Sequence, residues 1–191
     1  MRTKKLTVYL SGAIEYAPKD GSGWRKRITP RLKGLGYGVY DPVANNDSKL
    51  KMSVEEFNAL KLNDVEKYKE VVRDRIILSD YEGIINSDIL LAFYDESVQK
   101  GAGTLSEVAL CYLIGIPVLV ITKFKTKDIP GWLLAEIHDS FDNVNELLSF
   151  ISDKSKVKSL INKCKKYAGG DPIVYDIYKF MGRLFKDKSE R

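Results

Sequence analysis

Short apolar runs alternate along the chain with segments of helical periodicity. The apolar runs are bounded by glycine, proline or aspartate and predict strands at 5–12, 37–42, 88–94 and 116–122. The segments between and after them predict helices at 23–37, 54–78, 104–115 and 143–151. Strands that alternate with helices indicate a parallel sheet with helices on both faces. We therefore expect a Rossmann-like α/β fold.

Two segments interrupt this alternation. Pro30 lies inside the first predicted helix, so we expect a kink or a break there. Residues 43–53 are polar and predict a loop before helical periodicity resumes at Val54. In open parallel sheets, ligands bind beyond the carboxyl ends of the strands. That rule places Ser11 to Tyr16, Asp41, and Asp95 to Glu107 along one edge of the sheet.

The last 39 residues differ from the rest in composition. Residues 153–191 carry 11 lysines and arginines against 5 acidic residues, a net +6, so with a total of +5 residues 1–152 sum to −1. We predict a main domain at 1–152 and a basic, partly amphipathic helical extension at 153–191, broken into two helices at 169–172. The second of these helices carries an apolar stripe, which we expect to dock on a neighbouring subunit.

Charge, length and rare residues narrow the possible functions. The positive charge belongs to the extension, so nucleic-acid binding by the whole chain is disfavoured. No apolar run approaches the roughly 20 residues that span a bilayer, and the first residues lack a signal-peptide pattern, so we expect a soluble, cytoplasmic protein. Cys111, Cys164 and His138 stand in no metal-ligand spacing, and no dinucleotide or phosphate-loop motif occurs. We expect neither a metal nor a cofactor.

Glu107 has two competing interpretations. In "GTLSEVAL", Thr104 and Glu107 fit the capping box S/T-x-x-E, in which the glutamate bonds back to the N–H at the helix start. Alternatively, a carboxylate held at the edge of a parallel sheet beside a helix N-terminus is a positioned anionic nucleophile. The motif by itself leaves both open.

Three other residues carry the same ambiguity. Asp80 follows a possible helix cap at Ser79, and Asp95 follows a buried strand, where aspartate often forms turns. Tyr9, inside the first strand, is compatible with a plain core position. Three carboxylates, a tyrosine and a glycine-rich turn suit attack on an acetal-like carbon better than phosphoryl or hydride transfer.

Several segments together resemble a known family. They are "VYLSGAI" at 8–14, "EYAPKDGSGWRKRITP" at 15–30, "VYDP" at 39–42, "SDYEGIINSDILLAFYD" at 79–95, "GTLSEVALCYLIGIPVLVI" at 103–121 and "NELLSFI" at 145–151. In this order they resemble the nucleoside 2-deoxyribosyltransferases, a family with relatives that hydrolyse deoxynucleoside 5′-monophosphates. The resemblance covers about residues 5–152.

The resemblance implies a flavodoxin-like fold and a homo-oligomer whose active sites are completed across a subunit interface. It implies that Glu107 attacks C1′ of the deoxyribose, Asp80 handles the proton of the leaving base, and Tyr9 orients the nucleophile. Glu107 would be kept ionised by the amides of the helix start. The candidate substrate-binding residues are Ser11, Gly12, Arg25, Asp95, Lys100, Gly101, Gly103 and Thr104.

The substrate class stays open. Deoxynucleoside-using relatives usually carry an aspartate where this chain has Gly101-Ala102, and amides there with Lys100 favour a 5′-phosphate. Glu15, where phosphate-using relatives often have a basic residue, opposes it. "GAGTLSE" also resembles the cytokinin-activating phosphoribohydrolases, and a non-catalytic nucleotide-binding protein is a third hypothesis.

Overall fold

The sheet is a single layer of five parallel strands. The computed structural model describes residues 5–44, 50 and 52–168. The strands are β1 (Thr7–Gly12), β2 (Gly38–Tyr40), β3 (Ile89–Tyr94), β4 (Val118–Thr122) and β5 (Asp139–Phe141). Their order in the sheet is β2-β1-β3-β4-β5, and every neighbouring pair is parallel. This is the order of flavodoxin-like folds, so the expected fold class is confirmed.

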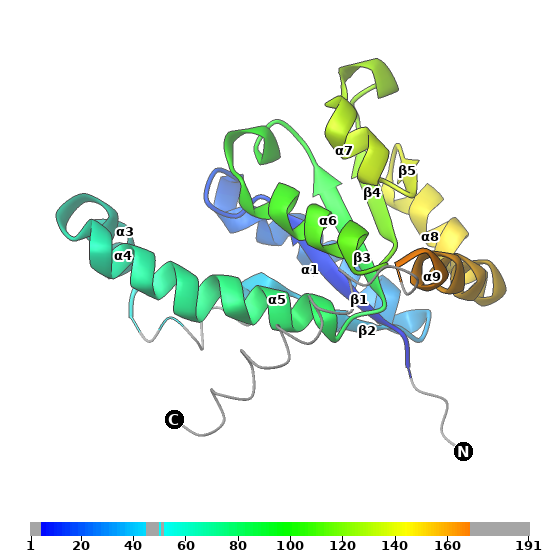
Figure 1. Cartoon of the computed structure of the whole chain (residues 1–191), viewed down its shortest axis with the longest axis horizontal. Helices are drawn as coiled ribbons and strands as arrows, with labels where there is room; N and C mark the ends of the chain where they lie inside the picture. The colour runs from blue at the N-terminus through cyan, green and yellow to red at the C-terminus, as the bar shows by residue number, and fades with distance from the viewer. Residues whose placement is uncertain (1–4, 45–49, 51, 169–191) are drawn as a thin grey trace.

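Two hydrophobic clusters cover the two faces of the sheet. On one face, Val8, Leu10 and Leu91 of the strands pack with helices α1 (Ser22–Gly34), α8 (Val144–Ser152) and α9 (Lys154–Ala168). On the other face, Tyr9 and Leu90 pack with α5 (Leu78–Ile85), α6 (Gly103–Leu113) and α7 (Gly131–Glu136). Figure 1 shows α6 crossing in front of the strands. The alternation of Val8, Tyr9 and Leu10 between the clusters is the two-residue period of a strand.

A long helical rod leads away from the sheet. It consists of α4 (Val65–Val71), a π-helical segment η2 (Val72–Ile77) and α5, with helical backbone angles at both junctions. Figure 1 shows this rod carrying α3 (Val54–Asn63) beyond the sheet. Short 3-10 turns occupy Pro18–Gly21, Val98–Lys100 and Thr126–Asp128. No helix among residues 5–44, 50 and 52–168 has both the length and the apolar character needed to cross a membrane.

Several local expectations need correction. The helix α1 is not broken at Pro30, although Pro30 has no N–H to donate to the Lys26 carbonyl one turn earlier. Residues 42–44 are helical, where we predicted the end of a strand at 42 and a loop from 43 to 53. Most of that loop lies outside the described residues. The sequence did not predict α7 and β5, because β5 is three residues long and contains Asp139 and Ser140.

The extension begins as predicted with a helix. Val157 and Ile161 of α9 belong to the same cluster as α1 and α8, so this helix packs on the described part of the chain. Its last turn lies against Gly115, whose φ is +72°. The predicted second helix, with its apolar stripe, lies outside the described residues.

We expect Gly115→Ala to destabilise the protein by about 2–4 kcal/mol. A Cβ at this position would lie 2.6 Å from Cβ of Ala168 and 2.8 Å from the carbonyl oxygen of Cys164, in a backbone conformation that favours glycine. The matched control is Gly34→Ala at the end of α1, where a Cβ meets nothing within 4 Å and should be neutral or slightly stabilising. Urea unfolding midpoints measure both. Equal midpoints for the two variants would contradict the packing of α9 against Gly115.

Candidate active site

Glu107 lies in the second turn of α6 with its side chain directed into the protein. The helix begins at Gly103 after a cap at Ala102, and no side chain caps it. The predicted capping box is therefore wrong: the helix begins two residues earlier than the box requires, which leaves Leu105 and not Glu107 at its third position. Only 9% of Glu107 is exposed. Helix capping therefore does not explain why a carboxylate occupies this position in α6.

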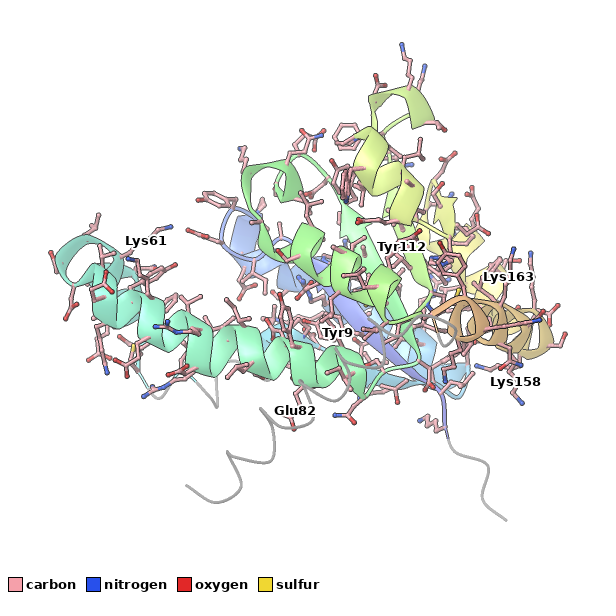
Figure 2. The ribbon with its side chains drawn as sticks, viewed as in Figure 1. Tyr9, Lys61, Glu82, Tyr112, Lys158 and Lys163 are labelled. Carbon is pink, nitrogen blue, oxygen red and sulfur yellow. The ribbon has the colours of Figure 1, made fainter. Side chains whose placement is uncertain are left out.

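Two hydroxyl groups of β1 hold the Glu107 carboxylate. The Tyr9 hydroxyl donates to Oε1 at 2.6 Å, and the Ser11 hydroxyl donates to Oε2. Tyr9 and Ser11 are two residues apart on one strand, so both face α6. Each carboxylate oxygen is therefore fixed by one donor, which sets the position and the plane of the group. Figure 2 shows Tyr9 in the space between α5 and α6.

Burial controls the protonation of this pair. Burial raises the pKa of Glu107 above its ordinary value of 4.5, and the hydrogen bonds from Ser11 and Tyr9, together with the Arg25 charge, oppose that rise. The donors are hydroxyls, not the helix amides that we expected. Burial, followed by the Glu107 and Asp80 charges, raises the pKa of Tyr9 well above 10.0. Tyr9 therefore stays a protonated donor through the neutral range.

Asp80 approaches the same tyrosine from α5. Its side chain is 8% exposed, and its charge, like that of Glu107, raises the pKa of Tyr9. The proposed cap at Ser79 is wrong, since Ile77 and Leu78 before it are already helical. The π-helical turn Val72–Ile77 ends just ahead of Asp80. Such wide turns change the angular position of the residues that follow and are frequent at functional sites.

Tyr40 of β2 is a site residue that the sequence did not reveal. Its ring stacks on Tyr9 with centroids 5.3 Å apart and planes 15° apart, and its hydroxyl donates to the Ser79 carbonyl at 3.1 Å. Gly83 makes room for it, because a Cβ there would lie 2.4 Å from the Tyr40 ring. Tyr40 thus links β2 to β1 through the Tyr9 ring and to α5 through Ser79. Its position in "VYDP" at the end of a strand was the available signal.

The glycine-rich segment forms a loop beyond β3. Asp95 Oδ1 accepts the backbone N–H groups of Ser97 and Val98 at 3.0 and 3.2 Å, so its carboxylate shapes the turn. Lys100 is exposed, and nothing lies within 4 Å of the Cβ position of Gly103.

Tyr16, from the loop after β1, lies over the same glycine-rich segment. The Cβ position of Gly101 lies 3.4 Å from the Tyr16 ring. Thr104, at the start of α6, is buried.

The remaining candidates belong to the loop after β1. Ser11 contacts Glu107, and the carbonyl of Gly12 accepts a hydrogen bond from Arg25 at 2.8 Å. Arg25 is 0% exposed and contacts the protein itself, in contrast to the substrate contact that we predicted for it. In the described part of the chain, no group of three or more His, Cys, Asp or Glu side chains could hold a metal ion.

We expect Glu107→Gln to raise the melting temperature at pH 7 and above. The folded-state pKa of Glu107 is raised, so its contribution to stability is complete below about 4.5 and is lost as the pH rises through the folded pKa. Glutamine keeps the shape without the buried charge; its oxygen can accept from one hydroxyl, and its NH2 group can donate to the other. Thermal melts from pH 4.5 to 8 measure the effect.

The control for this effect is Glu82→Gln on the exposed side of α5, which Figure 2 shows pointing away from the sheet. It should change the melting temperature little at any of these pH values. A Glu107→Gln protein no more stable than the wild type at pH 8, or a gain that does not shrink towards pH 4.5, would contradict the buried-charge assignment.

Comparison with known proteins identifies the fold. No protein-family model matches the chain, and no curated protein sequence matches it. Among solved structures, the chain is similar to the 2-deoxyribosyltransferase of Bacillus psychrosaccharolyticus, with a TM-score of 0.55 and 18% identity over 79% of this chain and 95% of that one. It is also similar to a conserved protein from Enterococcus faecalis V583, with a TM-score of 0.54 and 17% identity over 82% and 99%. The chain therefore has a nucleoside 2-deoxyribosyltransferase-like fold.

Proposed function

We propose that the protein cleaves or transfers the N-glycosidic bond of 2′-deoxynucleosides or their 5′-monophosphates through a covalent deoxyribosyl-Glu107 intermediate. The observation that carries this proposal is the buried Glu107 carboxylate, held by the Tyr9 and Ser11 hydroxyls at the carboxyl end of β1. The similarity to a 2-deoxyribosyltransferase structure supports it.

The first step forms a bond between a Glu107 oxygen and C1′. Each carboxylate oxygen has about two lone-pair sites, and Tyr9 and Ser11 occupy one site on each, so a free lone pair remains for attack. The C1′–N bond breaks as the new bond forms, and its electron pair goes to the base. Asp80 must be protonated when the substrate binds; it then supplies that proton to the departing base and is left as the carboxylate. The sugar passes through an oxocarbenium-like transition state, as in retaining glycosidases.

The second step releases the sugar from Glu107. A second base or a water molecule attacks C1′, the ester bond to Glu107 breaks, and Asp80 recovers the proton that the attacking group gives up. A second base gives transfer and water gives hydrolysis. The missing 2′-hydroxyl favours both steps, because that group would withdraw electrons from the developing positive charge.

The loop geometry favours a 5′-monophosphate substrate. Lys100 is exposed beside Gly101, and Gly103 opens α6 with free space at its Cβ position. Glu15, which we counted against a phosphate, pairs with Lys61 across a 2.5 Å contact. This exposed pair is weak in energy but offsets the negative charge locally.

The activity test is base release from the common deoxynucleosides and deoxynucleoside monophosphates, with and without a second free base. Glu107→Gln should reduce turnover by at least about a thousandfold, since nucleophile removal has effects of that order, while Glu82→Gln stays near wild type. Intact-mass measurement should detect a deoxyribosyl adduct on the wild type and none on Glu107→Gln. Near-normal turnover by folded Glu107→Gln would refute the nucleophile. A preference for ribonucleotides would instead favour a phosphoribohydrolase.

We expect Tyr9→Phe to move the acid limb of the kcat/KM profile to higher pH. Attack requires ionised Glu107, and the Tyr9 hydrogen bond lowers the pKa of Glu107, so its loss lets burial raise that pKa further. Tyr112→Phe, near the other end of α6, is the matched control and should leave the limb in place. An unmoved limb in a folded, active Tyr9→Phe protein would show that Tyr9 does not tune the nucleophile.

A further inference from the structure

Arg25 is a fully buried cation beside the candidate active site. Its exposed fraction is 0%, and its guanidinium is wrapped by backbone carbonyls. Nη2 donates to the Gly12 carbonyl at 2.8 Å, and Nη1 donates to the carbonyls of Gly21 and Ala13 at 3.0 and 3.5 Å. Nε makes no hydrogen bond but faces Asp41 Oδ1 at 3.6 Å.

These contacts fix the loop that follows β1. Gly12 comes directly after Ser11, so the Arg25 hydrogen bond to its carbonyl is one peptide unit from the hydroxyl that holds Glu107. Gly21 adopts φ +66°, and a Cβ there would lie 2.3 Å from the Ala13 carbonyl oxygen and 2.8 Å from Nη1 of Arg25. The two ends of the loop therefore close tightly around the guanidinium.

An aromatic pair supports the same strand end. Trp24 stacks on Phe93 of β3 with ring centroids 5.3 Å apart, and the Arg25 guanidinium lies 4.8 Å from the Trp24 ring centroid. A Cβ on Gly12 would be 3.2 Å from both the Phe93 carbonyl oxygen and the Trp24 ring. The end of β1 is thus confined between β3 and α1, with the cation at the junction.

Stability alone is a poor explanation for this arrangement. A buried charge is expensive unless it is paired and hydrogen-bonded, and apolar replacements of buried ion pairs are often neutral or stabilising. The Arg25–Asp41 pair is 3.6 Å apart without a hydrogen bond at Nε, and Asp41 is partly exposed. After Asp41, Glu107 is the next anion whose charge raises the pKa of Arg25 and so favours its protonated form.

We propose that Arg25 is a positioning residue, which holds the Ser11 end of β1 against Glu107 and supplies the buried positive charge that balances the Glu107 carboxylate. The proposal rests on the nucleophilic role proposed for Glu107. It replaces the substrate contact that the sequence suggested for Arg25.

The groups around Glu107 agree with this assignment. Tyr9 faces it from β1, Asp80 and Tyr81 lie near from α5, and Cys111 follows it on α6. None of these four is a cation. Among the described residues, Arg25 is the charged group that lowers the pKa of Glu107.

The test measures the Glu107 pKa directly, by carboxyl carbon NMR of protein labelled at glutamate, with the Glu107 signal assigned from its loss in Glu107→Gln. Arg25→Met should raise the Glu107 pKa, and Arg25→Lys should restore it in part because the charge is kept. Arg31→Met, an exposed arginine on the same helix, is the control and should leave it unchanged.

An unchanged Glu107 pKa in folded Arg25→Met would overturn the proposal. If Arg25→Met does not fold, Arg25→Gln decides, because it keeps polar N–H donors for the backbone carbonyls but removes the charge, and an unchanged Glu107 pKa there is the contrary result. No substrate is used, so the outcome is independent of the reaction. The acid limb of kcat/KM should follow the NMR shift if Glu107 is also the nucleophile. If the Glu107 pKa shifts in Arg25→Met but the wild-type protein releases no base from any substrate tested, the positioning role is upheld and the proposed function is rejected.

Discussion

The contact between the Glu107 carboxylate and the two hydroxyls of β1 is the constraint on which the site depends. It joins the first strand to a helix almost a hundred residues later, and it places a charge in a region that burial makes unfavourable for charge. The helix α6 cannot slide or rotate without breaking both hydrogen bonds. A catalytic carboxylate needs this fixed geometry, because near-attack positioning supplies much of the rate enhancement of an enzyme.

The topology explains why this contact forms at this edge of the sheet. In the order β2-β1-β3-β4-β5, the chain leaves β1 towards one edge and returns to β3 on its other side. The connections after β1 and β3 therefore run to opposite faces, and a space opens beyond their carboxyl ends. Gly12 and Phe93 are register partners at this point. The loop after β1 and the glycine-rich loop after β3, which leads into α6, both begin near this pair.

The sequence predicted the fold better than it predicted the contacts of the site. Buried parallel strands are continuous apolar runs, so β3 and β4 could be placed from periodicity alone. Glu107, Tyr9 and Asp80 were found as residue types in an ordered set, and they do meet in the structure. The partners that give them their properties could not be found, because they arise from tertiary packing. In "GWRKRITP", Arg25 resembles its exposed neighbours, and nothing local distinguishes the one that is buried.

The two buried charges have a common interpretation. Glu107 and Arg25 are both withdrawn from solvent, and burial shifts the pKa of each towards its neutral form. Apolar residues at these two positions would avoid the free-energy cost of burying both charges. Each charge partly offsets the unfavourable burial of the other at a distance, while the hydroxyls of Tyr9 and Ser11 supply the direct contacts. In the proposed reaction this arrangement leaves the Glu107 oxygens without a direct ion pair, because the Arg25 guanidinium donates to the backbone carbonyls of Gly12, Ala13 and Gly21 and not to Glu107.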